Sequence, residues 1–383
     1  MSTSADSHWL GVAARLALRG HGGAEPNPMV GCVIIAPDGS QVGWGYHARC
    51  GHAHAEAAAL ARAGSAARGS TAFVTLEPCA HHGRTPPCCD ALIASGVRRV
   101  VYGVTDPHSA AAGGAARLRA AGVAVDQVDH VGCDRVSAPF VRRMRFHSPW
   151  VVAKWAQTLD GRTATRSGDS RWISCPASRA MVHRERSRVD AVMVGIGTVL
   201  ADDPNLLPRI STPRRIPRRI IVDPGLVIPL DAQVIRTASK GPVAIAAHGR
   251  AIDALAQGRR SEFTHAGVEL LALQSVPPDC APRSFRGLQA GTMPALLHGL
   301  YAAGVSTLLV EGGAGLIGAL LDEDLVDDAW CFTAPLALAD GSGAPIATGH
   351  GRPLMIDALR FELLDIRRRG VDAMTHWRRA VQR

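Results

Sequence analysis

Four residues in the first quarter of the chain have the types and spacing of a catalytic zinc site. They are His54, Glu56, Cys79 and Cys88. One imidazole and two thiolates leave a tetrahedral zinc ion with one open position, where a water molecule can bind and lose a proton near neutral pH. A glutamate two residues after the histidine, with a Pro-Cys pair downstream, is the pattern in which that glutamate shuttles protons during deamination. The set therefore predicts hydrolytic loss of ammonia from an amidine carbon.

The cysteine beside Cys88 is an alternative ligand. A helix turns by about 100° per residue, so only one of Cys88 and Cys89 can face the metal. We predict Cys88, because it directly follows two prolines. We also expect Cys79 and Cys88 to lie near helix starts, where the helix dipole favours a thiolate. Further side chains are candidates in principle, and we expect most to line the pocket or face solvent: Cys50, His52, His81 and His82.

Alternating helices and strands must position these residues. Helical composition predicts helices at 8–19, 54–63 and 88–95, and apolar runs predict strands at 29–36, 72–76 and 99–104. This alternation is typical of an α/β layered domain. The pattern restarts with a strand at 150–155, which places the domain boundary there and gives domains 1–146 and 147–383. In the second domain, strands are expected at 191–194, 220–222, 243–247 and 307–310, and residues 208–219 are expected to form an exposed basic loop.

Composition narrows the class of protein. A length of 383 residues suits two domains, and no apolar run reaches the length of a membrane span. The start of the chain lacks the pattern of a signal peptide, so we expect a cytoplasmic protein without a membrane partner. The nine cysteines do not form a regular disulfide framework. The net charge of +9 comes from arginines spread along the chain, which favours small phosphate-bearing substrates over nucleic acid.

Longer motifs resemble the bifunctional pyrimidine deaminase/reductase family of riboflavin biosynthesis. The N-terminal half carries PNPMVG from Pro26, a histidine at His47, and TLEPCAHHGRTPPC from Thr75 to Cys88. Ordinary cytidine deaminases separate the two cysteines by only two residues, so the eight-residue spacer is specific. The resemblance implies a cytidine-deaminase-like three-layer domain with zinc on His54, Cys79 and Cys88 and with Glu56 as the proton shuttle. It places around the substrate Asn27, His47, His81 and Arg84.

The second half resembles the reductase domain of the same family, which implies a dihydrofolate-reductase-like α/β fold and NADPH as cofactor. The matching stretches begin at Lys154, Ser170, Val194 and Val310. The resemblance implies cofactor binding by Ala156, Trp172, Thr198, Asp202, Gly313, Ala314 and Gly315. It implies substrate binding by Ser170, Arg186, Leu206, Arg209 and Glu311. A glycine-rich turn after a strand suits a pyrophosphate, and guanidinium groups suit a phosphate.

The predicted function is therefore two consecutive steps of riboflavin biosynthesis. The first is deamination of 2,5-diamino-6-(5-phosphoribosylamino)pyrimidin-4-one, and the second is reduction of the ribosyl chain of 5-amino-6-(5-phosphoribosylamino)uracil. Family members tend to form homo-oligomers, which we expect here too.

The chain also departs from the family pattern. An expected asparagine is replaced by His108, Glu25 stands where a threonine is usual, and Pro224 follows Asp223 where a small hydroxyl residue is expected. The departures leave open a divergent paralogue in a specialised pathway, or a chain in which one domain is active. A nucleic-acid deaminase and a non-catalytic scaffold are weaker alternatives, because the cysteine spacing opposes the first and the retained Glu56 opposes the second.

Overall fold

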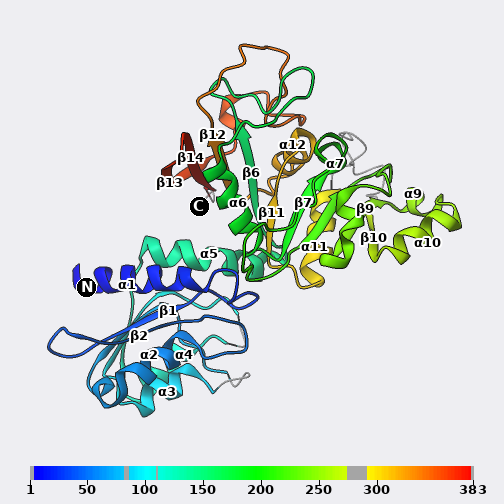
Figure 1. Ribbon diagram of the computed structural model, residues 1–383. Helices are drawn as coiled ribbons and strands as arrows, with labels where there is room; N and C mark the ends of the chain where they lie inside the picture. Colours follow the sequence, from blue (N-terminus) through cyan, green and yellow to red (C-terminus); the bar gives the residue numbers. More distant parts are fainter. Residues whose placement is uncertain (1–3, 82–85, 109–110, 274–290, 381–383) are drawn as a thin grey trace. The chain divides into compact units, whose positions relative to one another are not determined.

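The computed structural model describes residues 4–81, 86–108, 111–273 and 291–380 (Figure 1). The chain divides into two compact units, Met1–His147 and Ser148–Arg383. None of the helices within the described ranges combines the length and hydropathy needed to cross a bilayer.

The first unit is built on a five-stranded sheet with the order β2-β1-β3-β4-β5. Its strands are β1 (Gly31–Ile35), β2 (Gln41–Tyr46), β3 (Thr71–Leu76), β4 (Arg99–Val104) and β5 (Ala124–Gln127). The strands β2, β1 and β3 pair antiparallel, whereas β3, β4 and β5 pair parallel. The carboxyl ends of β3 and β4 therefore meet at one edge of the sheet.

Helices cover both faces of this sheet. Their bounds are α1 (Ser4–Ala17), α2 (Ala55–Ala63), α3 (Cys88–Ala94), α4 (Gly114–Ala120) and α5 (Val131–Phe146). On one face, Leu10 of α1 and Cys133 of α5 pack with Val33 and Phe73 of the sheet. On the other face, Ala59 of α2 packs in a second core with α3 and α4 (Figure 1). The unit is the predicted three-layer α/β domain.

The second unit contains a nine-stranded sheet with the order β10-β9-β8-β7-β11-β6-β12-β14-β13. The strands from β10 to β12 run parallel, and β14 and β13 add an antiparallel hairpin at the β12 end. Their bounds are β6 (Trp150–Gln157), β7 (Ala191–Gly195), β8 (Arg218–Val222), β9 (Val243–His248), β10 (Val268–Leu273), β11 (Thr307–Val310), β12 (Asp328–Thr333), β13 (Phe361–Arg369) and β14 (Asp372–Arg379).

Parallel strands need crossover connections, which here are mostly helical. The helices are α6 (Pro176–Arg186), α7 (Ile196–Asp202), α8 (Gln233–Arg236), α9 (Gly249–Asp253), α10 (Gln257–His265), α11 (Thr292–Ala302) and α12 (Ala314–Asp322). Leu297 of α11 and Leu320 of α12 are buried against Met193, Ile220 and Leu308 in the main core of the unit. The α/β class predicted for this half is thus observed.

One prediction about the second unit is wrong. Residues 208–219 are expected from the sequence to form an exposed loop throughout. Instead, β8 begins at Arg218, and the side chain of Arg219 is completely buried. Ile220 and Val222 face the main core. Because side chains alternate along a strand, Arg219 points to the opposite face of the sheet.

Candidate active sites

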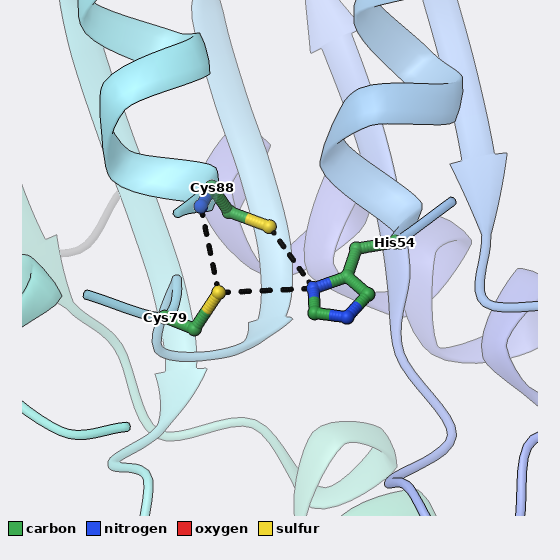
Figure 2. A group of neighbouring side chains, drawn as sticks. All are labelled: His54, Cys79 and Cys88. Atoms are coloured by element: carbon green, nitrogen blue, oxygen red, sulfur yellow. Dashed lines mark hydrogen bonds between the residues drawn. The ribbon is translucent and has the colours of Figure 1, made fainter. Parts of the chain in front are cut away.

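Three metal-binding side chains converge in the first unit. One donor atom each from His54, Cys79 and Cys88 lies within 4.8 Å of the other two. Figure 2 shows the imidazole of His54 pointing at both sulfur atoms. Its Nδ1 atom lies 3.2 Å from Cys88 Sγ and 3.7 Å from Cys79 Sγ. The cluster is the arrangement that the sequence spacing predicted.

Three different segments deliver these donors. His54 occupies the position before α2, in extended backbone, and Cys88 is the first residue of α3. Cys79 lies in the segment that follows β3, where its sulfur accepts the backbone N–H of Cys88 at 3.4 Å. The expectation that Cys79 would also lie at a helix start is therefore wrong, although a backbone donor from the start of α3 still reaches its sulfur.

The donor set fits zinc. Ligands about 2.0–2.3 Å from a tetrahedral zinc ion lie roughly 3.6 Å apart, close to the observed separations. Hydrogen bonds from the Cys88 thiol and from His54 lower the pKa of Cys79. The same thiol–thiolate contact, followed by burial, raises the pKa of Cys88. One thiol of this pair therefore resists ionisation while the other is a thiolate. A cation bound between them would stabilise both as thiolates.

Glu56 lies next to this cluster, on the first turn of α2. Its side chain is buried close to the donor cluster, where Cys79, His54 and Cys88 all influence its pKa. Burial and then the charge of Cys79 raise the pKa of Glu56 to about 7. Cys89 lies elsewhere: it is fully buried in the apolar core between the sheet and α2. The choice of Cys88 over Cys89 thus agrees with the geometry.

Two predicted substrate residues form a hydrogen-bonded pair beside the cluster. Nδ1 of His47 lies 3.1 Å from the carbonyl oxygen of Ala53, so this nitrogen carries the proton and donates it. Nε2 is then the acceptor for the amide of Asn27, at 3.2 Å. Burial lowers the pKa of His47. The ring packs edge-on against His54, with centroids 5.2 Å apart, which brings the pair to the metal ligands.

The structure shows fewer contacts for the other predicted substrate residues of this half. His81 is partly buried, and its Nδ1 atom has no hydrogen-bond partner among the described residues. Its ring centroid lies 6.4 Å from that of His108, the residue that replaces an expected asparagine. Arg84 and His82 lie outside the described residues. Cys50 and His52 do not belong to the donor cluster formed by the described residues.

Sequence reasoning missed one organising residue, Glu77. Its buried carboxylate accepts the backbone N–H of Asp106 at 3.3 Å and that of Ala115 at 3.0 Å. It thereby ties the segment carrying Cys79 to the end of β4 and the start of α4. At Gly114 the backbones approach so closely that a Cβ atom would meet the carbonyl oxygen of Pro78 at 1.7 Å. Only glycine fits there without displacing the segment.

The second unit holds a cavity of about 980 Å³. It opens at the carboxyl ends of the parallel strands, where β6, β7, β8 and β11 give way to loops. Ligands of open α/β sheets bind at this edge. Every residue predicted for the cofactor or substrate of this half lines the cavity: Ala156, Ser170, Trp172, Arg186, Thr198, Asp202, Leu206, Arg209, Glu311, Gly313, Ala314 and Gly315.

A buried ion pair forms one wall of this cavity. Arg186 of α6 pairs with Glu311 after β11, and the second bond of the fork measures 2.9 Å. Burial raises the pKa of Glu311, but Arg186 and then Lys154 outweigh this effect, so the carboxylate stays ionised. Burial lowers the pKa of Lys154. Lys154 also lines the cavity, and the sequence alone indicated no role for it, although it begins one of the matching stretches.

His183 is a second cavity residue without a predicted role. It lies one turn before Arg186 on α6, and its Nδ1 atom accepts the backbone N–H of Arg209 at 3.3 Å. Burial, followed by the charges of Arg186 and Arg209, lowers the pKa of His183 to about 4. The imidazole is thus neutral at pH 7 and keeps its other nitrogen protonated as a donor.

The glycine turn that directly follows Glu311 suits a nucleotide cofactor. Gly312 and Gly313 have φ angles of 90° and 52°, which glycine adopts without strain. They lead into the start of α12, and Gly312, Gly313, Ala314 and Gly315 all line the cavity. A helix start offers backbone N–H groups that suit a phosphate. A Cβ atom at Gly313 would lie only 3.2 Å from Thr198 Oγ1. The exposed ring of Trp172 packs on Arg179, whose guanidinium lies 4.6 Å from the ring centroid.

Comparisons with known proteins agree with this division. Residues 3–104 match the family model described as the cytidine and deoxycytidylate deaminase zinc-binding region, and residues 149–375 match the RibD C-terminal domain. The chain thus combines a zinc-binding deaminase domain with a pyrimidine reductase domain. Riboflavin biosynthesis protein RibD of Escherichia coli K12 is 38% identical over 381 residues, which cover 97% of this chain and 98% of the relative. The protein belongs to the RibD family of riboflavin biosynthesis enzymes.

Solved structures give the same result over both units. RibD of Acinetobacter baumannii superposes with a TM-score of 0.80 at 34% identity, covering 98% of this chain and 99% of that one. A Thermotoga maritima protein described as a diaminohydroxyphosphoribosylaminopyrimidine deaminase/5-amino-6-(5-phosphoribosylamino)uracil reductase gives a TM-score of 0.80 at 28% identity with the same coverage. These full-length similarities support the two-domain enzyme rather than the divergent alternatives.

Proposed function

We propose that the first unit deaminates 2,5-diamino-6-(5-phosphoribosylamino)pyrimidin-4-one, and that the second reduces the ribosyl chain of 5-amino-6-(5-phosphoribosylamino)uracil with NADPH. One observation carries the first half: the cluster of His54, Cys79 and Cys88 lies directly beside the buried carboxyl group of Glu56. The cavity that contains the ion pair between Arg186 and Glu311 supports the second half.

In the deaminase, His54, Cys79 and Cys88 would hold the metal. Zinc in this site supplies activation of a water molecule for attack on the amino-bearing ring carbon. Glu56 takes the proton of that water on its carboxylate and passes it to the departing amino group, so that ammonia leaves. His47 and Asn27 hold the pyrimidine, with the His47 tautomer fixed by Ala53. His81 would meet the phosphoribosyl arm, and the family resemblance implies the same contact for Arg84.

In the reductase, the turn at Gly313, Ala314 and Gly315 would bind the cofactor pyrophosphate, with Ala156, Trp172, Thr198 and Asp202 around the rest. NADPH supplies the electron pair that reduces C1 of the ring-opened ribose. Ser170, Arg186, Leu206, Arg209 and Glu311 orient the aminouracil and its phosphate. Because no side chain is needed as a nucleophile, the unit acts by positioning its two ligands. The preference for NADPH, a homo-oligomeric state and a cytoplasmic location belong to this proposal as expectations.

The experiment is a coupled assay on the full zinc-loaded chain. Ammonia release from the diaminopyrimidinone is measured first, and NADPH oxidation is measured after the deaminated product forms. Glu56→Gln preserves the shape of the side chain but cannot shuttle protons, so ammonia release should fall by roughly 10²–10⁴-fold. NADPH oxidation with the pre-formed uracil should stay unchanged. Ammonia release that survives Glu56→Gln would refute the assignment of Glu56.

A further inference from the structure

A completely buried arginine lies behind the loop that carries two of the proposed substrate residues. Arg219 of β8 has no exposed surface, and no carboxylate among the described residues pairs with it. Its Nη1 atom donates to the carbonyl oxygen of Asn205 at 3.1 Å and to Thr237 Oγ1 at 2.7 Å. Its Nη2 atom donates to the carbonyl oxygens of Thr237 at 2.9 Å and Gly241 at 2.6 Å. Two segments far apart in the chain, the loop at Asn205 and the stretch from Thr237 to Gly241, therefore converge on one guanidinium.

The buried positive charge of Arg219 stabilises this arrangement of hydrogen-bond acceptors. An ionised group taken out of water is costly unless hydrogen bonds replace its hydration, and bonds to a charged donor are stronger than neutral ones. Burial lowers the pKa of Arg219 to about 10, which still leaves it charged at neutral pH. The carbonyl groups that face Arg219 are thus held in place by its charge. One of them, that of Asn205, belongs to a loop whose neighbouring residues Pro204 and Leu206 line the reductase cavity.

This loop, residues 203–209, has a conformation that needs external support. Leu206 lies in the left-handed region with φ 58°, which is strained for any residue that carries a Cβ atom. Hydrogen bonds fix the backbone on both sides of it. The side chain of Asn205 accepts the N–H of Leu207 at 3.0 Å, and Arg186 donates to the carbonyl oxygen of Leu207 at 3.3 Å. Arg209 then donates its backbone N–H to His183.

We propose that Arg219 is a positioning residue of the reductase: from behind the sheet edge it fixes residues 203–209 so that Leu206 and Arg209 meet the substrate. The inference rests on the proposed function of the cavity. Arg186 and His183 hold the loop from the cavity side, whereas Arg219 holds the carbonyl of Asn205 from the protein interior. Arg219 does not line the cavity, so its effect on binding must act through the loop.

The neighbouring residue provides a matched control. Arg218 lies on the same strand and forms an ion pair with Glu269. Arg218→Lys therefore changes the same chemical group one position away without touching the loop. Thr237→Val removes one acceptor of Arg219 while it preserves the shape of the side chain. This second variant keeps the test decisive if Arg219→Lys does not fold.

The experiment measures steady-state NADPH oxidation by the full chain with the pre-formed aminouracil phosphoriboside, together with hydrogen exchange of the peptide covering 203–210. Arg219→Lys should raise KM for the uracil by about tenfold, the factor expected for a lost charged hydrogen bond, with kcat and NADPH affinity nearly unchanged. Amide exchange in the peptide should accelerate. Thr237→Val should shift both readouts in the same direction by less, and Arg218→Lys should leave them unchanged.

The two hypotheses fail in different ways. If the wild-type chain does not oxidise NADPH with this substrate, the proposed function is wrong, and the exchange data alone decide whether Arg219 fixes the loop. If the folded Arg219→Lys variant shows unchanged KM and unchanged amide exchange, the positioning role is refuted. It is also refuted if the variant lowers kcat alone, which is the behaviour of a partly unfolded protein. An equal effect of Arg218→Lys would refute it as well.

Discussion

The two sites of this protein are built in contrasting ways. In the deaminase unit, chemistry is concentrated in His54, Cys79 and Cys88, whose donor atoms lie within 4.8 Å of one another. In the reductase unit, the proposed ligand contacts are spread over loops around a cavity of about 980 Å³. The first site has three donors for one ion, whereas the second is proposed to bind a nicotinamide cofactor together with a substrate.

This contrast predicts different failures. A metal site loses its function when one donor is removed, because coordination is cooperative and each ligand is irreplaceable. A distributed binding site loses affinity in steps, because each loop contributes a part. The exception in the reductase is the buried ion pair of Arg186 and Glu311, two side chains for which we also propose a role in substrate binding.

The largest expected effect is that of Cys88→Ser. Loss of one thiolate should empty the deaminase of zinc and lower ammonia release by several orders of magnitude, because the activated water is lost with the metal. Elemental analysis and the ammonia assay measure these two quantities. Cys89→Ser, one residue further along α3, should keep full zinc content. Equal zinc loss in both variants would show that the ligand assignment is wrong.

A smaller effect is expected when the buried ion pair is broken. Arg186→Met leaves the Glu311 carboxylate buried without its guanidinium, which should lower the free energy of unfolding of the second unit by about 3 kcal/mol. The pair's side chains are only 12% and 7% exposed. Urea unfolding measures the change, and NADPH oxidation should disappear while ammonia release persists.

Arg188→Met is the control for this variant. Arg188 is 34% exposed and contacts Glu185 at 3.9 Å, so its loss should cost less than about 1 kcal/mol. Comparable destabilisation by both variants would mean that the second unit depends on helix α6 in general rather than on the ion pair. Loss of ammonia release in Arg186→Met would contradict the independence of the two sites.

The contrast also explains what could be predicted from the sequence. The zinc donors were found because a tetrahedral ion imposes residue types and a spacing that a sequence displays directly. The cavity residues were found through the resemblance to a family, since neither Leu206 nor Ala156 has chemistry of its own. The roles of Glu77 and Arg219 were not found. Glu77 binds backbone groups of Asp106 and Ala115, far along the chain, and no local pattern records such contacts.

Arg219 shows why the basic stretch was misinterpreted. A run rich in proline and arginine is usually exposed. Arg218 fits this expectation in part, because it is only partly buried and pairs with Glu269. The burial of Arg219 depends on carbonyl groups supplied by the later residues Thr237 and Gly241. The β13–β14 hairpin was missed for a related reason, since its strands carry many arginines and few buried side chains.

The smallest expected effect is a pH dependence confined to the second unit. In the unfolded chain His183 titrates near 6.5, whereas burial and the charges of Arg186 and Arg209 lower its pKa in the folded protein to about 4. Between these two values the unfolded chain binds more protons, so stability is complete above pH 6.5 and declines as the pH falls toward 4. The partly exposed ring should contribute a loss on the order of 2 kcal/mol, less than the full shift would give.

Urea unfolding of the wild type and His183→Gln across this pH range tests the assignment. Glutamine retains an acceptor for the backbone N–H of Arg209 but does not titrate, so the variant should show a flatter pH profile between 6.5 and 4. Below 4.5 the carboxylate of Glu311 begins to contribute, because its pKa is also lowered, and both proteins should lose stability together. His265→Gln, at an exposed position of α10, should keep the wild-type slope. Parallel profiles for wild type and His183→Gln would mean that His183 is protonated in the folded cavity, and its proposed neutral contact with the Arg209 backbone would have to be abandoned.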